Sequence, residues 1–236
     1  MSGNVPTVEH GPTAGTTPPN GGGTYVYGMK SVEPDVGAVA LFCTQANFSP
    51  IADGKGGRIT GALKRSSNGS PTGFAPFMFL AAQASDVSGE AYVLGLSDET
   101  ASRIELRKGP LVDGVPAVSL VSPAVSPFIL MRSTDTFLPN TWQHLRLDVI
   151  KQGTGDVILQ VFRNDLALHS VNSPVWAAVP GMEGPQYPVL SGFVDDSLGV
   201  NTGSVPIAGG RAGFGCRFDA SNRVAYFDHF SVDRQL

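Results

Sequence analysis

Aspartate and glutamate side chains are the first candidates for catalytic residues in this sequence. Glycoside hydrolysis needs two carboxyl groups about 5–10 Å apart, one of them protonated and the other ionised. Asp98 and Glu99 are neighbours, but they lie in an expected turn and point in different directions. We therefore interpret them as solvated turn residues. The six glutamates are dispersed along the chain at Glu9, Glu33, Glu90, Glu99, Glu105 and Glu183.

The motifs of other common chemistries are also missing. No Gly-x-Ser-x-Gly sequence marks a serine nucleophile, and the glycine-rich segment 54–58 lacks the order of a phosphate-binding loop. The four histidines, His10, His144, His169 and His229, show no spacing typical of a metal site. His144 alternates with Arg146 and Asp148, which predicts a plain surface residue on a polar strand face. We predict no catalytic residue, no cofactor and no metal, and hence a protein that is not an enzyme.

One acidic cluster lies in a long loop. Asp195 and Asp196, with Asn201 nearby, could offer oxygen ligands to calcium together with backbone carbonyl groups. The order of ligands in an EF-hand is missing, so the sequence favours a hydrated loop over a metal site. These three residues remain candidates for ligand or interface contacts.

Aromatic side chains are the remaining candidates for binding. Trp176 and Tyr187 lie in a proline-rich stretch, where a large ring is harder to bury. We predict that they contribute to a contact surface with either sugar or protein.

The composition limits both the fold and the partners. With 29 glycines and 18 prolines in 236 residues, the chain favours many short strands joined by turns over a helical bundle. A net charge of −4 excludes the basic surface typical of nucleic-acid binding. The start of the sequence lacks the features of a secretory signal, and no apolar run is long enough for a membrane helix. We expect neither a nucleic acid nor a membrane as partner.

Alternating and short apolar runs predict about twelve strands and no helix. The clearest alternation is at 142–150, where Leu145, Leu147 and Val149 are expected to point inward. We predict an extended arm over residues 1–24, in which 15 residues are Gly, Pro or Thr. A single domain built of β-strands should follow over 25–236, with a long loop insertion near 172–210. The main expected strands are 36–43, 58–64, 74–83, 90–96, 103–108, 142–150, 157–163 and 224–232.

Several of these runs resemble a known family. The segment 140–149, Asn-Thr-Trp-Gln-His-Leu-Arg-Leu-Asp-Val, with the hairpin strand that begins at Asp156, resembles a signature of laminin-G-like domains. The segments 77–82, 91–97, 103–109, 210–215 and 225–232 resemble other strands of the same group. The resemblance implies an all-β, two-sheet antiparallel jelly-roll sandwich of the concanavalin A-like superfamily. Hydrolases of that superfamily carry Glu-x-Asp-x-Glu or a bulged variant on one strand, and this chain does not.

Two functions follow from the resemblance and the composition. The first is a structural subunit of a tailed-phage particle, in a capsid decoration, tail or baseplate, assembled in the host cytoplasm. Its low charge density and its arm suit contacts with other virion proteins and with copies of itself. The alternative is a carbohydrate-binding module for host-surface glycans, with Trp176, Tyr187 and the loop from Asp195 to Asn201 as its binding edge.

Overall fold

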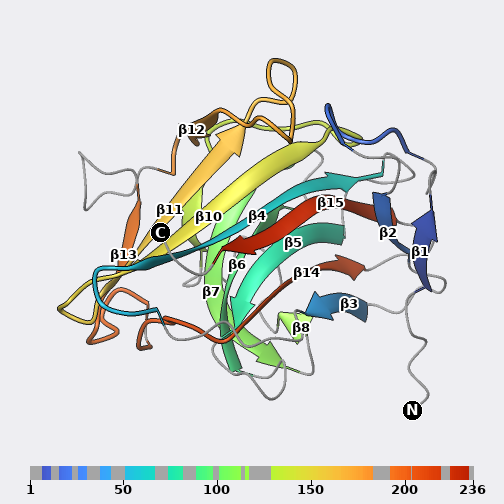
Figure 1. Ribbon diagram of the computed structural model, residues 1–236. Coiled ribbons are helices and arrows are strands. Elements are labelled where there is room, and N and C mark those ends of the chain that lie inside the picture. The colour runs from blue at the N-terminus through green and yellow to red at the C-terminus, as the bar shows by residue number, and fades with distance from the viewer. Residues whose placement is uncertain are drawn as a thin grey trace, which may run out of the picture.

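The computed structural model shows two antiparallel β-sheets stacked face to face (Figure 1). Every regular element in the described part of the chain is a strand, which confirms the predicted all-β jelly-roll sandwich. No helix long and apolar enough to cross a membrane occurs in this part. The structure describes residues 7–11, 16–22, 26–30, 38–43, 51–66, 74–81, 89–97, 101–112, 115–116, 129–182, 192–202, 204–218 and 224–233.

Within the described residues, the first sheet has eight strands, and it positions the candidate site. Its order is β1-β2-β15-β4-β10-β11-β12, and β13 also pairs with β11. The bounds are β1 (Thr7–Gly11), β2 (Val26–Lys30), β15 (Val224–Asp233), β4 (Gly56–Arg65), β10 (Gln143–Lys151), β11 (Val157–Asn164), β12 (Trp176–Ala178) and β13 (Phe193–Asp195).

The second sheet has seven strands in the described part of the chain, and it packs against the other side of the core. Its order is β3-β14-β5-β6-β7-β8, and β9 also pairs with β7. The bounds are β3 (Ala38–Cys43), β14 (Arg211–Phe218), β5 (Phe74–Ala81), β6 (Gly89–Leu96), β7 (Ile104–Val112), β8 (Val115–Pro116) and β9 (Ile129–Arg132).

The core lies between the sheets, and the alternation of β10 shows how the sequence builds it. Leu145, Leu147 and Val149 are at most 1% exposed and belong to the core cluster, as predicted. Each such side chain gains roughly 1.5–3 kcal/mol from leaving water. The intervening residues of β10 point to the opposite, outer face of the sheet, because successive side chains on a strand alternate.

Parts of the N-terminal segment contact the chain's own sandwich. β1 pairs with β2 along its whole length at the edge of the eight-stranded sheet. The indole N–H of Trp142 donates to the Thr17 carbonyl at 2.9 Å, and the Val171 N–H donates to the Asn20 carbonyl at 2.8 Å. Trp142 is partly buried, and its indole lies against this segment. The division of the chain near residue 24 stays a prediction.

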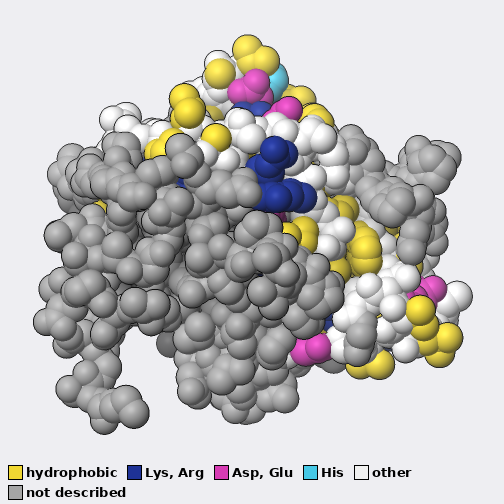
Figure 2. Space-filling model, turned by 180° about the vertical axis from the view of Figure 1, so that it is seen from behind, with side chains coloured by type: hydrophobic (Ala, Val, Ile, Leu, Met, Phe, Trp, Pro, Cys, Tyr) yellow, Lys and Arg dark blue, Asp and Glu magenta, His cyan; other side chains and the backbone are white. Residues whose placement is uncertain are grey.

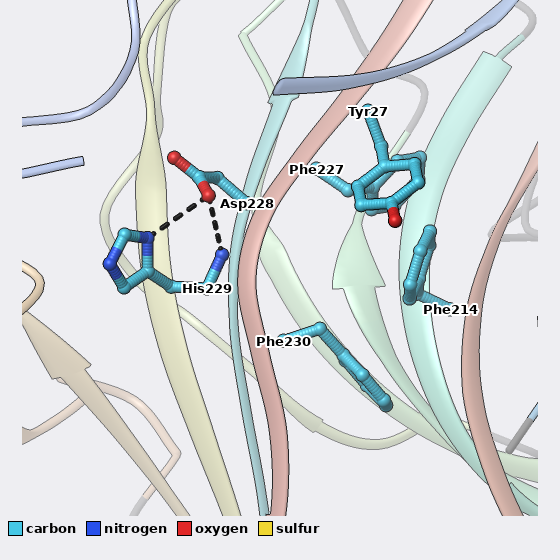
Figure 3. A pocket seen from close by; sticks show the side chains of 6 residues that line it. All are labelled: Tyr27, Phe214, Phe227, Asp228, His229 and Phe230. Carbon is cyan, nitrogen blue, oxygen red and sulfur yellow. Dashed lines mark hydrogen bonds and ion pairs between the residues drawn. The ribbon is translucent and has the colours of Figure 1, made fainter. Parts of the chain in front are cut away.

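A β-bulge in β15 changes the direction of two side chains beside the site. The pairing with β4 passes from Asp228 to Ser231, so that His229 and Phe230 together lie opposite Gly61. His229 has a φ of 50°, which a residue with a side chain rarely adopts. Figure 3 shows the result: His229 and Phe230 project to opposite sides of β15.

Candidate functional site

A groove of about 380 Å³ lies on the outer face of the eight-stranded sheet. Residues of β4, β10, β12 and β15 form it, together with residues from the segment between β11 and β12. We call it the outer groove. Its described lining consists of Arg58, Thr60, His144, Val171, Pro174, Trp176, His229, Phe230, Ser231 and Asp233.

An aromatic ring, Trp176, forms one wall of the outer groove. It begins β12, whose register places it opposite Asn164 at the end of β11. The imidazole of His144 lies against it with ring centres 4.6 Å apart, and the Arg146 guanidinium lies 5.8 Å from its centre. The indole is therefore braced by two neighbours while part of it stays exposed.

Charged side chains form a polar row beside this wall. The Arg58 Nε donates to Oδ1 of Asp148 at 2.8 Å, and Arg146 Nε donates to the same carboxylate at 2.9 Å. Burial opposes the ionisation of Asp148, but the hydrogen bonds from Arg146 and Arg58 outweigh it and lower the pKa. On the neighbouring strands, the hydroxyl groups of Thr60 and Ser231 form a hydrogen bond of 2.6 Å. The row thus combines fixed charges with exposed hydroxyl groups.

His144 lies where the wall meets the polar row. It is 2% exposed, so the prediction of a plain surface residue is wrong. The physical reason is that the Trp176 side chain, which begins the edge strand β12, packs against the imidazole at a tilt, and residues of the segment before β12 line the same groove. Burial, with a smaller effect of His229, lowers the pKa of His144 to about 4, which leaves the imidazole neutral at pH 7.

His229 connects the bulge to the segment that follows β11. Its Nδ1 lies 3.0 Å from Oδ1 of Asp228, and its Nε2 forms a 3.1 Å hydrogen bond with Oδ1 of Asn172. Figure 3 shows the contact with Asp228 on the side of β15 away from the aromatic rings. On the other side, Phe230 and three further aromatic side chains line a second cavity of about 290 Å³. Asp228 and His229 also line this second cavity, and both His229 and Phe230 line the outer groove, so the bulge lies between the two sites and contributes to each.

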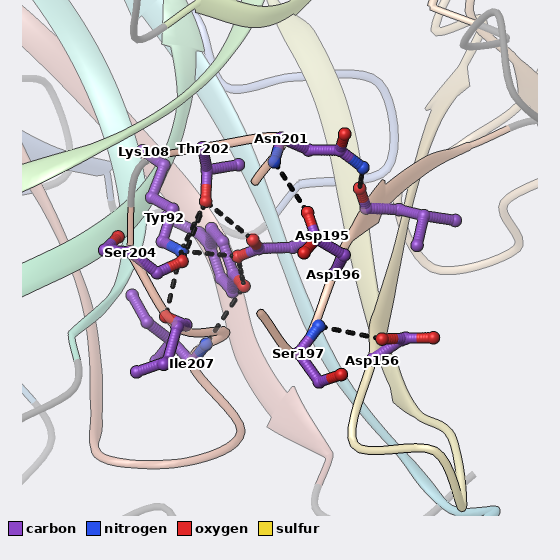
Figure 4. Close-up of polar contacts among 12 residues, drawn as sticks. Tyr92, Lys108, Asp156, Asp195, Asp196, Ser197, Asn201, Thr202, Ser204 and Ile207 are labelled. Atoms are coloured by element: carbon purple, nitrogen blue, oxygen red, sulfur yellow. Dashed lines mark hydrogen bonds and ion pairs between the residues drawn. The ribbon is translucent and has the colours of Figure 1, made fainter. Parts of the chain in front are cut away.

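Asp195 lies on β13 opposite the beginning of β11, and Figure 4 shows the polar contacts around it. Its side chain is fully buried, and its carboxylate lies 2.7 Å from Nζ of Lys108. The hydroxyl groups of Tyr92 and Thr202 also donate to it, and burial, followed by the charge of Asp195, raises the pKa of Tyr92. These contacts hold the loop to the core.

Asp196 and Asn201 hold the loop from within. The Asp196 carboxylate accepts backbone N–H bonds from Leu198, Val200 and Asn201, and those from Val200 and Asn201 contribute most to its lowered pKa. The Asn201 amide donates to the Val194 carbonyl at 3.0 Å. Within the described residues, no group of three or more His, Cys, Asp or Glu side chains is placed to hold a metal ion.

The candidate contact residues predicted from the sequence do not lie together in one site. Trp176 pairs with the end of β11 at Asn164, whereas Asp195 pairs with its beginning at Val157. Seven residues of a strand separate these positions by roughly 23 Å. Tyr187 lies outside the described residues. Of the predicted contacts in the described residues, only Trp176 lines the outer groove. The residues around it were missed because they come from three other strands and from the segment before β12.

Hydrophobic side chains with high exposure are found at several positions in the described part of the chain, namely Leu138, Leu168, Val175, Leu198, Val200 and Val205. On the face seen in Figure 2, the hydrophobic side chains of described residues form separate yellow areas between polar atoms. On this face, none of these areas is a large continuous patch of the kind that marks many protein interfaces.

Comparison with known proteins shows similarity at the level of fold. No family model and no curated protein sequence matches the chain. Similar solved structures include the PL-14 alginate lyase from Aplysia kurodai, with a TM-score of 0.48 and 8% identity over 96% of this chain and 86% of that one. The Emp47p carbohydrate recognition domain gives 0.47 and 10% identity over 95% and 93%. A legume lectin-like domain from Entamoeba histolytica gives 0.43 and 10% identity over 87% and 82%.

The prediction that the protein is not an enzyme is wrong in the light of this comparison. An alginate lyase is among the solved structures of similar fold. The prediction depended on the absence of paired carboxylates, which glycoside hydrolysis needs. An elimination reaction instead needs a base that removes a proton, so the lack of such a pair does not exclude it.

Proposed function

We propose that this protein binds carbohydrate in the outer groove. The observation that carries the proposal is the position of the partly exposed Trp176 ring beside a row of polar side chains on adjacent strands. A sugar ring presents C–H groups on one face and hydroxyl groups at its rim. The indole of Trp176 can pack against the C–H face. The side chains of Arg58, Thr60 and Ser231 can form hydrogen bonds with the hydroxyl groups.

The size and rigidity of the groove support the same function. Its volume of about 380 Å³ falls within the range of roughly 300–1,000 Å³ for small-molecule sites. Arg58 is held by Asp148, and Trp176 is braced by His144 and Arg146, so little ordering is needed on binding. Carbohydrate recognition was the alternative expectation from the sequence. A structural role in a phage particle has no comparable supporting observation.

Replacement of Trp176 tests the proposal. We expect the wild-type protein to bind at least one polymer in a panel of neutral, N-acetylated and uronate polysaccharides that includes alginate. Trp176→Ala should weaken that binding by tenfold or more, which is about 1.4 kcal/mol. Isothermal titration calorimetry measures both affinities. Ultraviolet absorbance of the same mixtures reports unsaturated products, and so distinguishes binding alone from cleavage by elimination.

The second tryptophan of the chain provides the control. Trp142 contacts Thr17 and Lys64 and is not part of the groove lining. Trp142→Phe should therefore leave the affinity unchanged. A wild-type protein that binds nothing in the panel, or a Trp176→Ala variant that binds as well as the wild type, would contradict the proposal.

A further inference from the structure

The amide of Asn164 has only one orientation that satisfies its surroundings. The side chain is fully buried. Its Oδ1 accepts the N–H of Val175 at 3.0 Å, and its Nδ2 donates to the carbonyl of Ser170 at 3.2 Å. A flipped amide would place oxygen against a carbonyl oxygen and an N–H₂ group against an N–H. Two backbone groups therefore fix which atom is nitrogen.

The fixed amide decides where His144 carries its proton. Nδ2 of Asn164 also lies 3.2 Å from Nδ1 of His144, in register across β10 and β11. Because Nδ2 is a donor, Nδ1 must accept, and a neutral imidazole then holds its single proton on Nε2. Protonation of Nδ1 would set two donors against each other. The lowered pKa of His144 agrees with the neutral form.

We infer that Asn164 is a positioning residue that holds His144 as an Nε2–H donor in the outer groove. His144 lines the groove, and Nε2 has no hydrogen-bond partner among the described residues. This inference rests on the proposed function. If His144 presents an Nε2–H donor, the bound saccharide places an acceptor oxygen against Nε2, such as that of a carboxylate, carbonyl or hydroxyl group. An ammonium group of a ligand is disfavoured at the same position.

Nitrogen-15 NMR of the imidazole rings tests the tautomer without any ligand. In the wild-type protein at pH 7, we expect the His144 signals of an unprotonated Nδ1 and a protonated Nε2. Asn164→Asp replaces the donor by a carboxylate acceptor, and should move a proton onto Nδ1. A wild-type His144 that is protonated on Nδ1, or on both nitrogens, would overturn the inference.

Affinity measurements test the role of the donor. His144→Gln keeps an N–H donor, whereas His144→Leu removes it. For the saccharide bound by the wild type, we expect His144→Leu to lose about three- to tenfold in affinity and His144→Gln to retain more of it. Equal affinities of His144→Leu and the wild type would overturn the role.

The two experiments fail in distinguishable ways. If binding depends on Trp176 but the His144 tautomer is the opposite one, the inference fails and the proposed function stands. If the tautomer is as expected but no saccharide binds, the proposed function fails, and with it the role of His144 in selecting a ligand.

Discussion

Lys108→Met is expected to lower the free energy of unfolding by about 3–5 kcal/mol, because it leaves the buried carboxylate of Asp195 without its cation. The ammonium group of Lys108 also donates to Oγ1 of Thr202 and to the carbonyls of Ser204 and Val205, at 2.8–2.9 Å. All of these acceptors would lose a charged donor at once. The loop that follows β13 would then lose its main attachment to β7.

Thermal unfolding followed by circular dichroism measures this effect, and a decrease in Tm on the order of 10 °C is expected. Lys151→Met is a matched control, because Lys151 pairs at 3.0 Å with Asp53, whose side chain is 60% exposed. An exposed pair of this kind contributes at most about 1 kcal/mol. If Lys108→Met were no more destabilising than Lys151→Met, the buried ion pair would not hold the loop.

A double variant separates the lost ion pair from the uncompensated charge. Lys108→Met combined with Asp195→Leu removes both charges and leaves apolar side chains in their place. We expect this double variant to be more stable than Lys108→Met alone, since most of the penalty arises from the unpaired carboxylate. A further decrease would show instead that the polar contacts of Asp195 with Tyr92 and Thr202 contribute more than the charge costs.

The strands could be predicted because they carry local signals, whereas their arrangement in two stacked sheets was implied by the family resemblance. On β10, the alternation of Leu145, Leu147 and Val149 with polar residues required one buried face, whichever sheet the strand joined. This period of two is a property of consecutive residues. It can therefore be recognised in the sequence of one strand, without knowledge of the strands that pair with it.

The site could not be predicted in the same way, because its residues meet through the sheet order. Arg58, His144 and Ser231 are far apart in the sequence, and they lie together because β15, β4 and β10 are neighbours. His144 follows the pattern of an exposed residue along its own strand. It is buried by Trp176, 32 positions later, which no pattern within β10 reports.

The same limit applies to Asp195. Its acidic neighbour and loop position indicated a hydrated cluster, and the sequence held no local sign of a cation. The cation, Lys108, lies on β7 in the other sheet. Only the stacking of the two sheets brings these charges together.

Lowering the pH from 7 to 4.5 is expected to reduce the free energy of unfolding more in the wild type than in His144→Gln, by about 2 kcal/mol. The folded protein keeps His144 neutral down to about pH 4, whereas the unfolded chain takes up a proton near the ordinary pKa of 6.5. The stability from the neutral imidazole is therefore complete above pH 6.5, and decreases as the pH falls towards 4. Below that, both states are protonated and the loss is constant.

Chemical denaturation at a series of pH values measures this difference. Asp148 and the other carboxylates are present in both proteins, so their contributions largely cancel in the comparison. The two curves should run parallel above pH 6.5 and converge or cross as the pH falls. Parallel curves over the whole range would mean that His144 is protonated in the folded protein at the same pH as in the unfolded chain. In that case neither burial by Trp176 nor the donor at Asn164 would hold the imidazole neutral.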